Sequence, residues 1–309
     1  MKIDVVLPVF NAEGKLERCL QGITKQRSEA DINILIVDGG SSDRTVSIAE
    51  KYGCDITVKP GIYSDGLLGS RQYVISKSTA ELLWFVDSDN YIAEDYVAQR
   101  LLEPFLTLDD VNISIPQVIP DPGAHPFSNY LSLIDALGIE LMMVHSQKIG
   151  DHYLVEDMEH GITNCSLIRR SAILKIGGWD SDVKVLWRLR SKRLSKGAIS
   201  ETSHYYHVQA TGIMDYIRKQ RTRLRRFSKM TDEDLDHFYI KNSEAGGYPK
   251  LNTSKLLSLS MPLKGLREYY RTGQKTWLWG CAQPIINFAV VASIPLSAVN
   301  ARRRYFSSD

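Results

Sequence analysis

The sequence has few cysteines for a chain of 309 residues. They lie far apart and without paired spacing, at Cys19, Cys54, Cys165 and Cys281. This spacing indicates neither a disulfide framework nor a zinc motif, and it favours a reducing compartment. The strand pattern that begins at Ile3 is not preceded by the basic and apolar regions of a signal peptide, so we expect this part of the chain to lie in the cytoplasm.

Charge is missing between residues 276 and 301, a run long enough to span a bilayer as a helix. Residues typical of interfacial anchors stand at its two ends: Trp277, Trp279, Arg302, Arg303 and Arg304. Pro284 and Pro295 inside the run predict a bent, re-entrant or in-plane segment with both ends on the cytoplasmic side. A buried core helix of a soluble protein is the alternative.

The composition, with 43% hydrophobic and 24% charged residues, is that of an ordinary globular protein, and the net charge of +2 gives no reason to expect a nucleic-acid partner. The charge is unevenly distributed. Residues 203–309 carry 17 Lys and Arg against 8 Asp and Glu, whereas residues 1–202 carry 21 against 28. The basic residues are densest in 218–229, which favours contact with anions.

Short apolar runs alternate with helical patterns over the first hundred residues. The expected strands are 3–9, 32–37, 55–58 and 81–86, and the expected helices are 13–24, 44–52 and the end of 61–78. This alternation is typical of βαβ units and predicts an α/β fold with a mostly parallel sheet.

The rest of the chain is expected to be more helical. A strand is predicted at 111–118, and helices at 129–143, 171–176, 212–229 and 254–271. In 254–271, leucines alternate with lysines and arginines, a pattern typical of helices at a membrane surface. We therefore expect a catalytic domain over 1–210 and a basic, membrane-associated helical region over 211–309.

Carboxylates follow two of the predicted strands. Asp87 and Asp89 come after the buried strand 81–86, and Asp38 and Asp43 flank a Gly-Gly-Ser-Ser turn after the second strand. Ligands gather at the carboxyl ends of strands in such sheets, and carboxylate oxygens suit Mg²⁺ or Mn²⁺. The same residues also fit a solvated turn, and Asp43 fits the N-cap of the next helix.

Four motifs stand in order along the first ninety residues: Pro8-Val9-Phe10-Asn11, Val37 through Asp43, Gly66 through Gln72, and Val86-Asp87-Ser88-Asp89. Together they resemble family 2 of the glycosyltransferases, most clearly over about residues 1–100 and faintly beyond 200. The resemblance implies a GT-A fold and an inverting enzyme that uses a nucleoside-diphosphate sugar and a divalent metal, Mg²⁺ or Mn²⁺.

The resemblance also implies roles for individual residues. Asp89 is the implied main metal ligand, and Asp87 lies near both ribose and metal. The implied nucleotide-sugar-binding residues are Pro8, Phe10, Asn11, Asp38, Gly40, Asp43, Arg71, Asp87 and Ser88. The family's usual Asp-Asp-Gly-Ser is Asp38-Gly39-Gly40-Ser41 here, so one carboxylate is missing and the nucleobase stays open.

Gly177-Gly178-Trp179-Asp180 matches the family segment beside the acceptor site. The Glu-Asp pair that normally follows is Ser181-Asp182, so Asp182 is the expected general base and Asp180 the alternative, with Glu156-Asp157 a more distant one. As general base, Asp182 needs its pKa raised by burial or neighbouring carboxylates.

Four further residues are candidates for contact with the diphosphate or the acceptor: His204, His207, Gln220 and Arg223. Hydrogen-bonded scaffold histidines and a solvated basic helix are the alternatives. The basic segments favour a lipid-linked acceptor, such as a polyprenyl phosphate, at the cytoplasmic face of the cell membrane.

Two other functions compete with sugar transfer. A nucleotidyltransferase of the same fold predicts a Gly-rich loop with a basic residue directly after the first strand, which residues 8–14 lack. A non-catalytic member of a glycan-assembly complex is favoured only by the missing glutamate beside Asp182.

Overall fold

The computed structural model describes residues 1–61, 68–159, 161, 164–179, 182–227 and 260–292. The chain forms two compact units. The first combines Met1–Ile119 with Asp135–His207, and the second combines Pro120–Ile134 with Val208–Asp309. The second unit therefore takes in a short segment from the middle of the chain as well as the C-terminal region.

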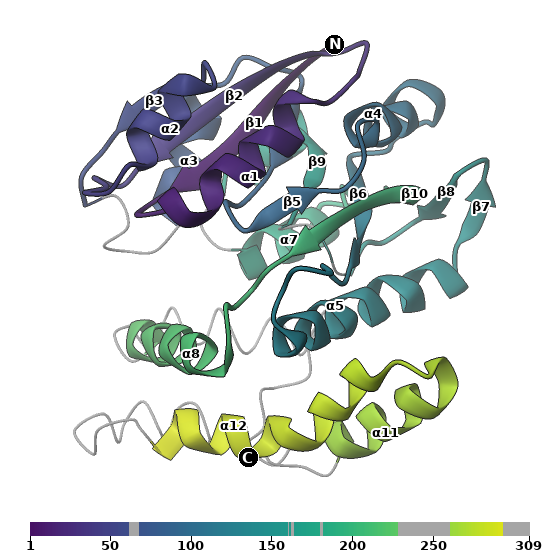
Figure 1. Cartoon of the computed structure of the whole chain (residues 1–309). Helices are drawn as coiled ribbons and strands as arrows, with labels where there is room; N and C mark the ends of the chain where they lie inside the picture. Colours follow the sequence, from purple (N-terminus) through teal and green to yellow (C-terminus); the bar gives the residue numbers. More distant parts are fainter. Residues whose placement is uncertain (62–67, 160, 162–163, 180–181, 228–259, 293–309) are drawn as a thin grey trace. The chain divides into compact units, whose positions relative to one another are not determined.

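The first unit is built on one mixed sheet with the strand order β3-β2-β1-β4-β9-β6-β10-β8-β7, and β5 pairs with β10 (Figure 1). Its strands are β1 (Lys2–Val9), β2 (Asp31–Asp38), β3 (Asp55–Val58), β4 (Leu82–Phe85), β5 (Asn90–Ile92), β6 (Ile113–Ile119), β7 (Gln147–Ile149), β8 (His152–Val155), β9 (Ser166–Arg169) and β10 (Gly197–His207). β1 runs parallel to both β2 and β4, which confirms the parallel sheet predicted for the N-terminal half.

Helices connect these strands. They are α1 (Glu13–Thr24), α2 (Thr45–Lys51), α3 (Leu68–Lys77), α4 (Val97–Thr107), α5 (Pro126–Val144), α6 (Arg170–Lys175) and α7 (Asp182–Ser191), and α5 begins in the second unit. The predicted bounds of α1 and β3 agree with the structure, because both elements show their periodicity locally.

The core of the first unit lies around β1 and β4. Every residue of β4 is buried, as is β1 after its first residue; β4 is a continuous apolar run, and β1 is apolar from Val5 onward. α1 buries its stripe of Leu16, Cys19, Leu20 and Ile23 and contacts α2 and β5. Each fully buried leucine contributes on the order of 2 kcal/mol through removal of apolar surface from water.

Among the elements missing from the sequence-based prediction are β9 and β10. β9 lies antiparallel between β4 and β6. β10 pairs with β6 and with the short strand β5, and in the latter pairing His207 stands opposite Asn90. Both arrangements join segments far apart along the chain, which local periodicity does not reveal.

The second unit contains α8 (Ile213–Phe227), α11 (Ser260–Thr272), η1 (Lys275–Leu278) and α12 (Trp279–Ala292). Phe127 at the start of α5 makes edge contacts with Tyr216 and Trp279, whose ring centroids lie 5.1 and 5.6 Å away. α11 packs closely on η1 and α12, since a Cβ at Gly265 would lie 2.5 Å from the carbonyl oxygen of Trp277 in η1 and 3.2 Å from Cα of Gly280 in α12. The described part of the uncharged segment is therefore anchored by Trp277, which is buried, while Ile285 is 71% exposed.

Among the described residues, α5 alone is long and apolar enough to cross a bilayer by length and composition, with 39% of its apolar window buried. The core helix of a soluble protein meets the same criterion, so this is weak evidence for a span.

Candidate active site

The carboxyl ends of β1, β2 and β4 bring three sequence motifs to one edge of the sheet. Val9 is the register partner of Asp38, and Val6 is the partner of Phe85, two residues before Asp87. Parallel strands that are hydrogen-bonded neighbours lie about 4.8 Å apart. The loops carrying Asn11, Asp38 and Asp87 are thus neighbours because β1 lies between β2 and β4.

Asp38 organises the loop after β2. Its carboxylate is fully buried and accepts hydrogen bonds from the backbone N–H groups of Gly40 and Ser41, over 2.9 and 2.8 Å, and from the Ser41 hydroxyl. Gly40 has φ +90°, and a Cβ there would lie 3.2 Å from Pro60. Asp38 therefore stabilises the turn after β2, one of the two roles that the sequence left open. Asn11 is attached to the same loop, because its side-chain oxygen accepts a hydrogen bond from the Ser42 N–H over 3.0 Å.

Asp43 ties the β2 loop to the starts of α1 and α2. Its carboxylate accepts from the N–H of Glu13 over 3.1 Å, and from both the N–H and the hydroxyl of Thr45. Burial alone would raise the pKa of Asp43, but these hydrogen bonds to the ionised form bring the pKa below its ordinary value. The N-cap of α2 is Arg44, so the expected capping role of Asp43 is wrong: Asp43 lies one residue before the cap and holds Thr45, the first residue of the helix.

Pro8 and Phe10 lie at the end of β1 and just after it, Pro8 buried and Phe10 51% exposed. Ser88 is buried between the two aspartates. Burial leaves Pro8 and Ser88 in the framework of the site, and a role for Phe10 in nucleotide-sugar binding stays a prediction.

Asp87 is paired with a buried cation. Nη2 of Arg71, on α3, lies 2.9 Å from both carboxylate oxygens, and Arg71 is only 1% exposed. Two further contacts hold the turn: the Asp87 N–H donates to Oδ1 of Asn90, and the Cys19 thiol donates to the Asp87 carbonyl oxygen. Burial raises the pKa of the Cys19 thiol, so it remains a protonated donor.

Trp179 packs against the end of β4 and lies over Arg71. Its ring is stacked on Phe85 with centroids 4.1 Å apart, and the Arg71 guanidinium lies 5.3 Å from the ring centroid. The backbone N–H of Trp179 donates to Oε1 of Gln72 over 2.6 Å. The Gly-Gly-Trp segment is therefore attached both to the end of β4 and to α3.

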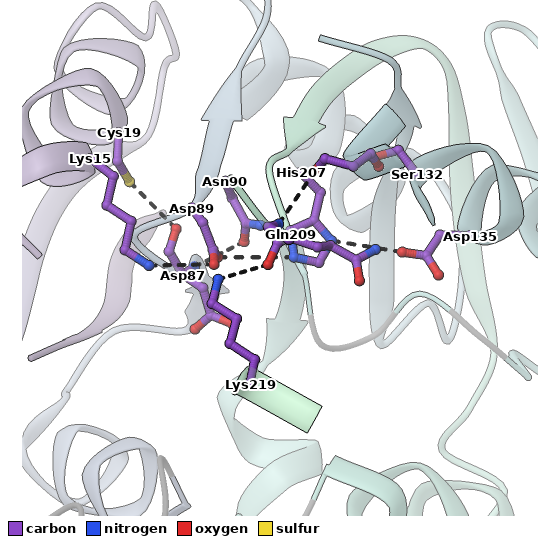
Figure 2. Close-up of polar contacts among 12 residues, drawn as sticks. Lys15, Cys19, Asp87, Asp89, Asn90, Ser132, Asp135, His207, Gln209 and Lys219 are labelled. Carbon is purple, nitrogen blue, oxygen red and sulfur yellow. Dashed lines mark hydrogen bonds and ion pairs between the residues drawn. The ribbon is translucent and has the colours of Figure 1, made fainter. Parts of the chain in front are cut away.

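Asp89 stands between two nitrogen-bearing side chains (Figure 2). Nζ of Lys15, in the first turn of α1, lies 3.4 Å from Oδ2, and Nε2 of His207 lies 3.9 Å from Oδ1. The Asp89 side chain keeps 20% of its surface exposed. Lys15 belongs to none of the sequence motifs. Only its position in the first turn of the first helix could have indicated that it lies at the site.

The two candidate histidines are used differently. Successive β-strand residues alternate between faces, so His204 and His207 on β10 point to opposite faces of the sheet. His207 lies beside Asp89, with its Nδ1 3.7 Å from Oδ2 of Asp135. His204 instead pairs with Glu94 over 2.7 Å, and its N–H donates to the same carboxylate. Only His207 joins the site.

The candidate bases lie near the start of α7 or just after β8. Asp182 is the first residue of α7, and its side chain, like the whole of Asp180, lies outside the described residues. Asp157 is engaged elsewhere, because Arg190 pairs with it at 2.7 Å and the Ser195 hydroxyl donates to it over 2.6 Å. Asp182 and Asp180 therefore stay predictions, and Asp157 has a structural use.

Two predicted residues belong to the second unit. Gln220 and Arg223 both lie on α8, where Gln220 is half-buried and the Arg223 side chain lies outside the described part. Their role at a diphosphate stays a prediction.

The order of this sheet and the carboxylates that follow β4 define an α/β protein whose ligand site lies at the carboxyl ends of its parallel strands. The chain belongs to the family described as "Glycosyl transferase family 2", whose match covers residues 4–177. The family expected from the four motifs is thus confirmed.

Known proteins share the N-terminal part or the fold. A poly(ribitol-phosphate) beta-glucosyltransferase of Bacillus spizizenii is 32% identical over 100 residues, which are 31% of this chain and 16% of that protein. A mannosyltransferase from Pyrobaculum calidifontis in complex with GDP-Man and Mn²⁺ has a TM-score of 0.52 at 15% identity, over 94% of this chain and 86% of that one.

The crystal structure of S. aureus TarS 1–349 in complex with UDP-GlcNAc has a TM-score of 0.50 at 17% identity, over 99% of this chain and 88% of that one. Likenesses at this identity show the fold alone. The matched region spans only 26%, 16% and 17% of the first three curated relatives, two of which are named for sugar transfer to poly(ribitol phosphate).

Proposed function

We propose that the chain is an inverting glycosyltransferase that takes a sugar from a nucleoside-diphosphate sugar with the help of a divalent cation. The observation that carries the proposal is the position of Asp87 and Asp89 at the carboxyl end of β4. Only β1 lies between β4 and β2, the strand that ends in Asp38. The known relatives support it by family, and two of the solved structures of the same fold contain nucleotide sugars.

The donor set fits Mg²⁺ or Mn²⁺ bound together with a substrate. Asp89 would be the main protein ligand; Asp87, whose carboxylate is held by Arg71, and His207, 3.9 Å from Asp89, lie next to it without completing a three-residue ligand group. No group of three or more His, Cys, Asp or Glu side chains is placed to hold a metal within the described part of the chain. A site with one or two carboxylates is typical of Mg²⁺, which completes its coordination with phosphate oxygens of the substrate and with water.

Bound there, the cation would neutralise charge on the departing diphosphate. Arg71 orients Asp87 and balances its charge, and Trp179 packs over the Arg71 guanidinium. Asp182, or Asp180 in its place, takes the proton of the acceptor hydroxyl as its oxygen bonds to the anomeric carbon of the sugar. The bond from that carbon to the diphosphate oxygen breaks on the opposite face, which inverts the configuration.

The test is hydrolysis of a panel of nucleotide sugars, including UDP-GlcNAc and GDP-mannose, with Mn²⁺, with Mg²⁺ and with EDTA. We expect one donor to be preferred and turnover to require metal. Asp89→Ala should lose at least about a hundredfold in rate, because a charge-stabilising group at the leaving oxygen is removed. Asp55→Ala, an exposed aspartate at the start of β3, is the matched control. Equal rates for the two variants would refute the proposal.

The acceptor and location form a second part of the proposal: a lipid-linked or polyprenyl-phosphate acceptor at the cytoplasmic face of the cell membrane. It is supported by α11, which exposes Leu263 and Tyr270 by 65% and 82% in the same helix as Arg267 and Arg271. Apolar side chains interleaved with basic ones are typical of a helix lying at an anionic interface.

Co-sedimentation with vesicles of phosphatidylglycerol and phosphatidylcholine tests this part. Changing both Leu263 and Tyr270 to Ser should reduce binding several-fold, because less apolar surface enters the interface. Changing Leu106 on α4 to Ser, which is 50% exposed in the first unit, should leave binding unchanged. Failure of the wild-type chain to bind such vesicles would remove the membrane from the proposal and leave sugar transfer intact.

A further inference from the structure

Lys15 lies where a divalent cation would compete with it. Its ammonium is 3.4 Å from Oδ2 of Asp89, and its side chain is 35% exposed against 20% for the carboxylate. The pair joins residues 74 positions apart and connects the first turn of α1 to the turn after β4. Asp89 is thus already in contact with one positive charge.

The two neighbours of Asp89 differ in what they can do when a metal arrives. A neutral imidazole has a nitrogen lone pair, so His207 at 3.9 Å can remain beside the cation or ligate it. An ammonium has three donors and no lone pair, so Lys15 can only be repelled. The flexible stem of lysine lets the charge move by several ångströms while α1 stays in place.

The place of α1 limits where that charge goes. The helix is held on the site by Cys19, whose thiol contacts the Asp87 carbonyl oxygen, and by the backbone of Glu13, which donates to Asp43. The ammonium therefore stays near the aspartate turn after it leaves Asp89. A diphosphate brought in with the metal would be the anion within its reach.

We propose that Lys15 is a counter-ion of Asp89 in the ligand-free chain and transfers to a phosphate oxygen of the nucleoside diphosphate when metal binds. This rests on the proposed function. Metal binding without nucleotide is then opposed by Lys15, and metal and nucleotide strengthen each other's binding, because the displaced ammonium gains an anion only when both are present.

Electron paramagnetic resonance of free Mn²⁺ measures this directly. In the absence of nucleotide, Lys15→Met should bind Mn²⁺ about five-fold more tightly than wild type, the factor expected when a partly exposed ion pair no longer competes. Lys15→Arg should behave like wild type, and so should Lys25→Met, which removes a lysine at the other end of α1. Adding UDP or GDP should then increase Mn²⁺ affinity less in Lys15→Met than in wild type.

The nucleotide-free measurement decides the proposal by itself. Equal Mn²⁺ affinity for wild type and Lys15→Met, or no binding by either, would overturn it. The variant Asp89→Ala distinguishes failure of the role proposed for Lys15 from failure of the proposed metal site. If Asp89→Ala loses Mn²⁺ while Lys15→Met matches wild type, only the role of Lys15 fails. If Asp89→Ala binds Mn²⁺ as well as wild type, the metal site in the proposed function fails with it.

Discussion

Gln72 and Trp179 are 107 positions apart in the sequence, and the side-chain oxygen of Gln72 accepts the backbone N–H of Trp179 over 2.6 Å. Gln72 follows Arg71 on α3, so the same turn of helix that supplies the cation for Asp87 also holds the Gly-Gly-Trp segment. One helix, α3, is thereby attached both to the Arg71–Asp87 ion pair and to the Gly-Gly-Trp segment. That segment precedes the predicted bases, Asp180 and Asp182.

Gly178 is the position where this attachment leaves least room. It has φ +96°, and a Cβ there would meet the Gln72 amide at 2.3 Å, whereas Gly177, at φ +87°, has nothing within 4 Å of a Cβ. Gly177→Ala should therefore cost about 1 kcal/mol of unfolding free energy from backbone strain alone. Gly178→Ala should cost about 1 kcal/mol more, because the Gln72 hydrogen bond is lost as well.

Urea denaturation of the two variants checks this difference. Combining Gly178→Ala with Gln72→Ala should give less than the sum of the single effects, since both remove the same hydrogen bond. Equal destabilisation by the two glycine substitutions would show that the Gln72 contact contributes nothing.

The two aspartates of the turn after β4 should differ in stability effects. Asp87→Asn removes the carboxylate beside the buried Arg71 and should cost about 3 kcal/mol, because a buried cation loses its balancing charge. Asp89→Asn weakens partly exposed contacts, with Lys15 and His207, and should cost less than about 1 kcal/mol. Denaturant unfolding at pH 7 provides the measurement. A larger loss for Asp89→Asn than for Asp87→Asn would contradict the arrangement.

The pKa of Asp43 gives a prediction on pH dependence. Because the folded-state pKa is lowered, Asp43 contributes stability above its unfolded pKa of about 3.9, and this contribution disappears as pH falls through the folded value. Carbon-detected NMR titration should place the folded pKa of Asp43 below that reference.

Thr45 is the matched probe for Asp43. Thr45→Val removes a hydroxyl that donates to the carboxylate and should raise the pKa of Asp43, whereas Thr45→Ser should leave it low. An unchanged pKa in Thr45→Val would show that the backbone donors alone set it.

Part of the site was predictable because its signals are local. The helix 13–24 has its apolar stripe within one segment, and Asp38, Asp87 and Asp89 follow apolar strands whose direction places them at one sheet edge. The motifs also predicted the family, and the family match confirms that prediction. The roles of individual site residues stay predictions.

By itself, then, the sequence determined the parallel strands β1 to β4, the loops at their ends and the family, since these depend on periodicity and motif spacing. Tertiary structure alone decided that β9 enters antiparallel beside β4, that His207 rather than His204 lies at Asp89, and that Lys15 pairs with that carboxylate. The physical reason is that the sequence pattern of a strand does not specify its partner strand. In the same way, the sequence around a charged residue does not indicate which distant group will lie beside it in the folded protein.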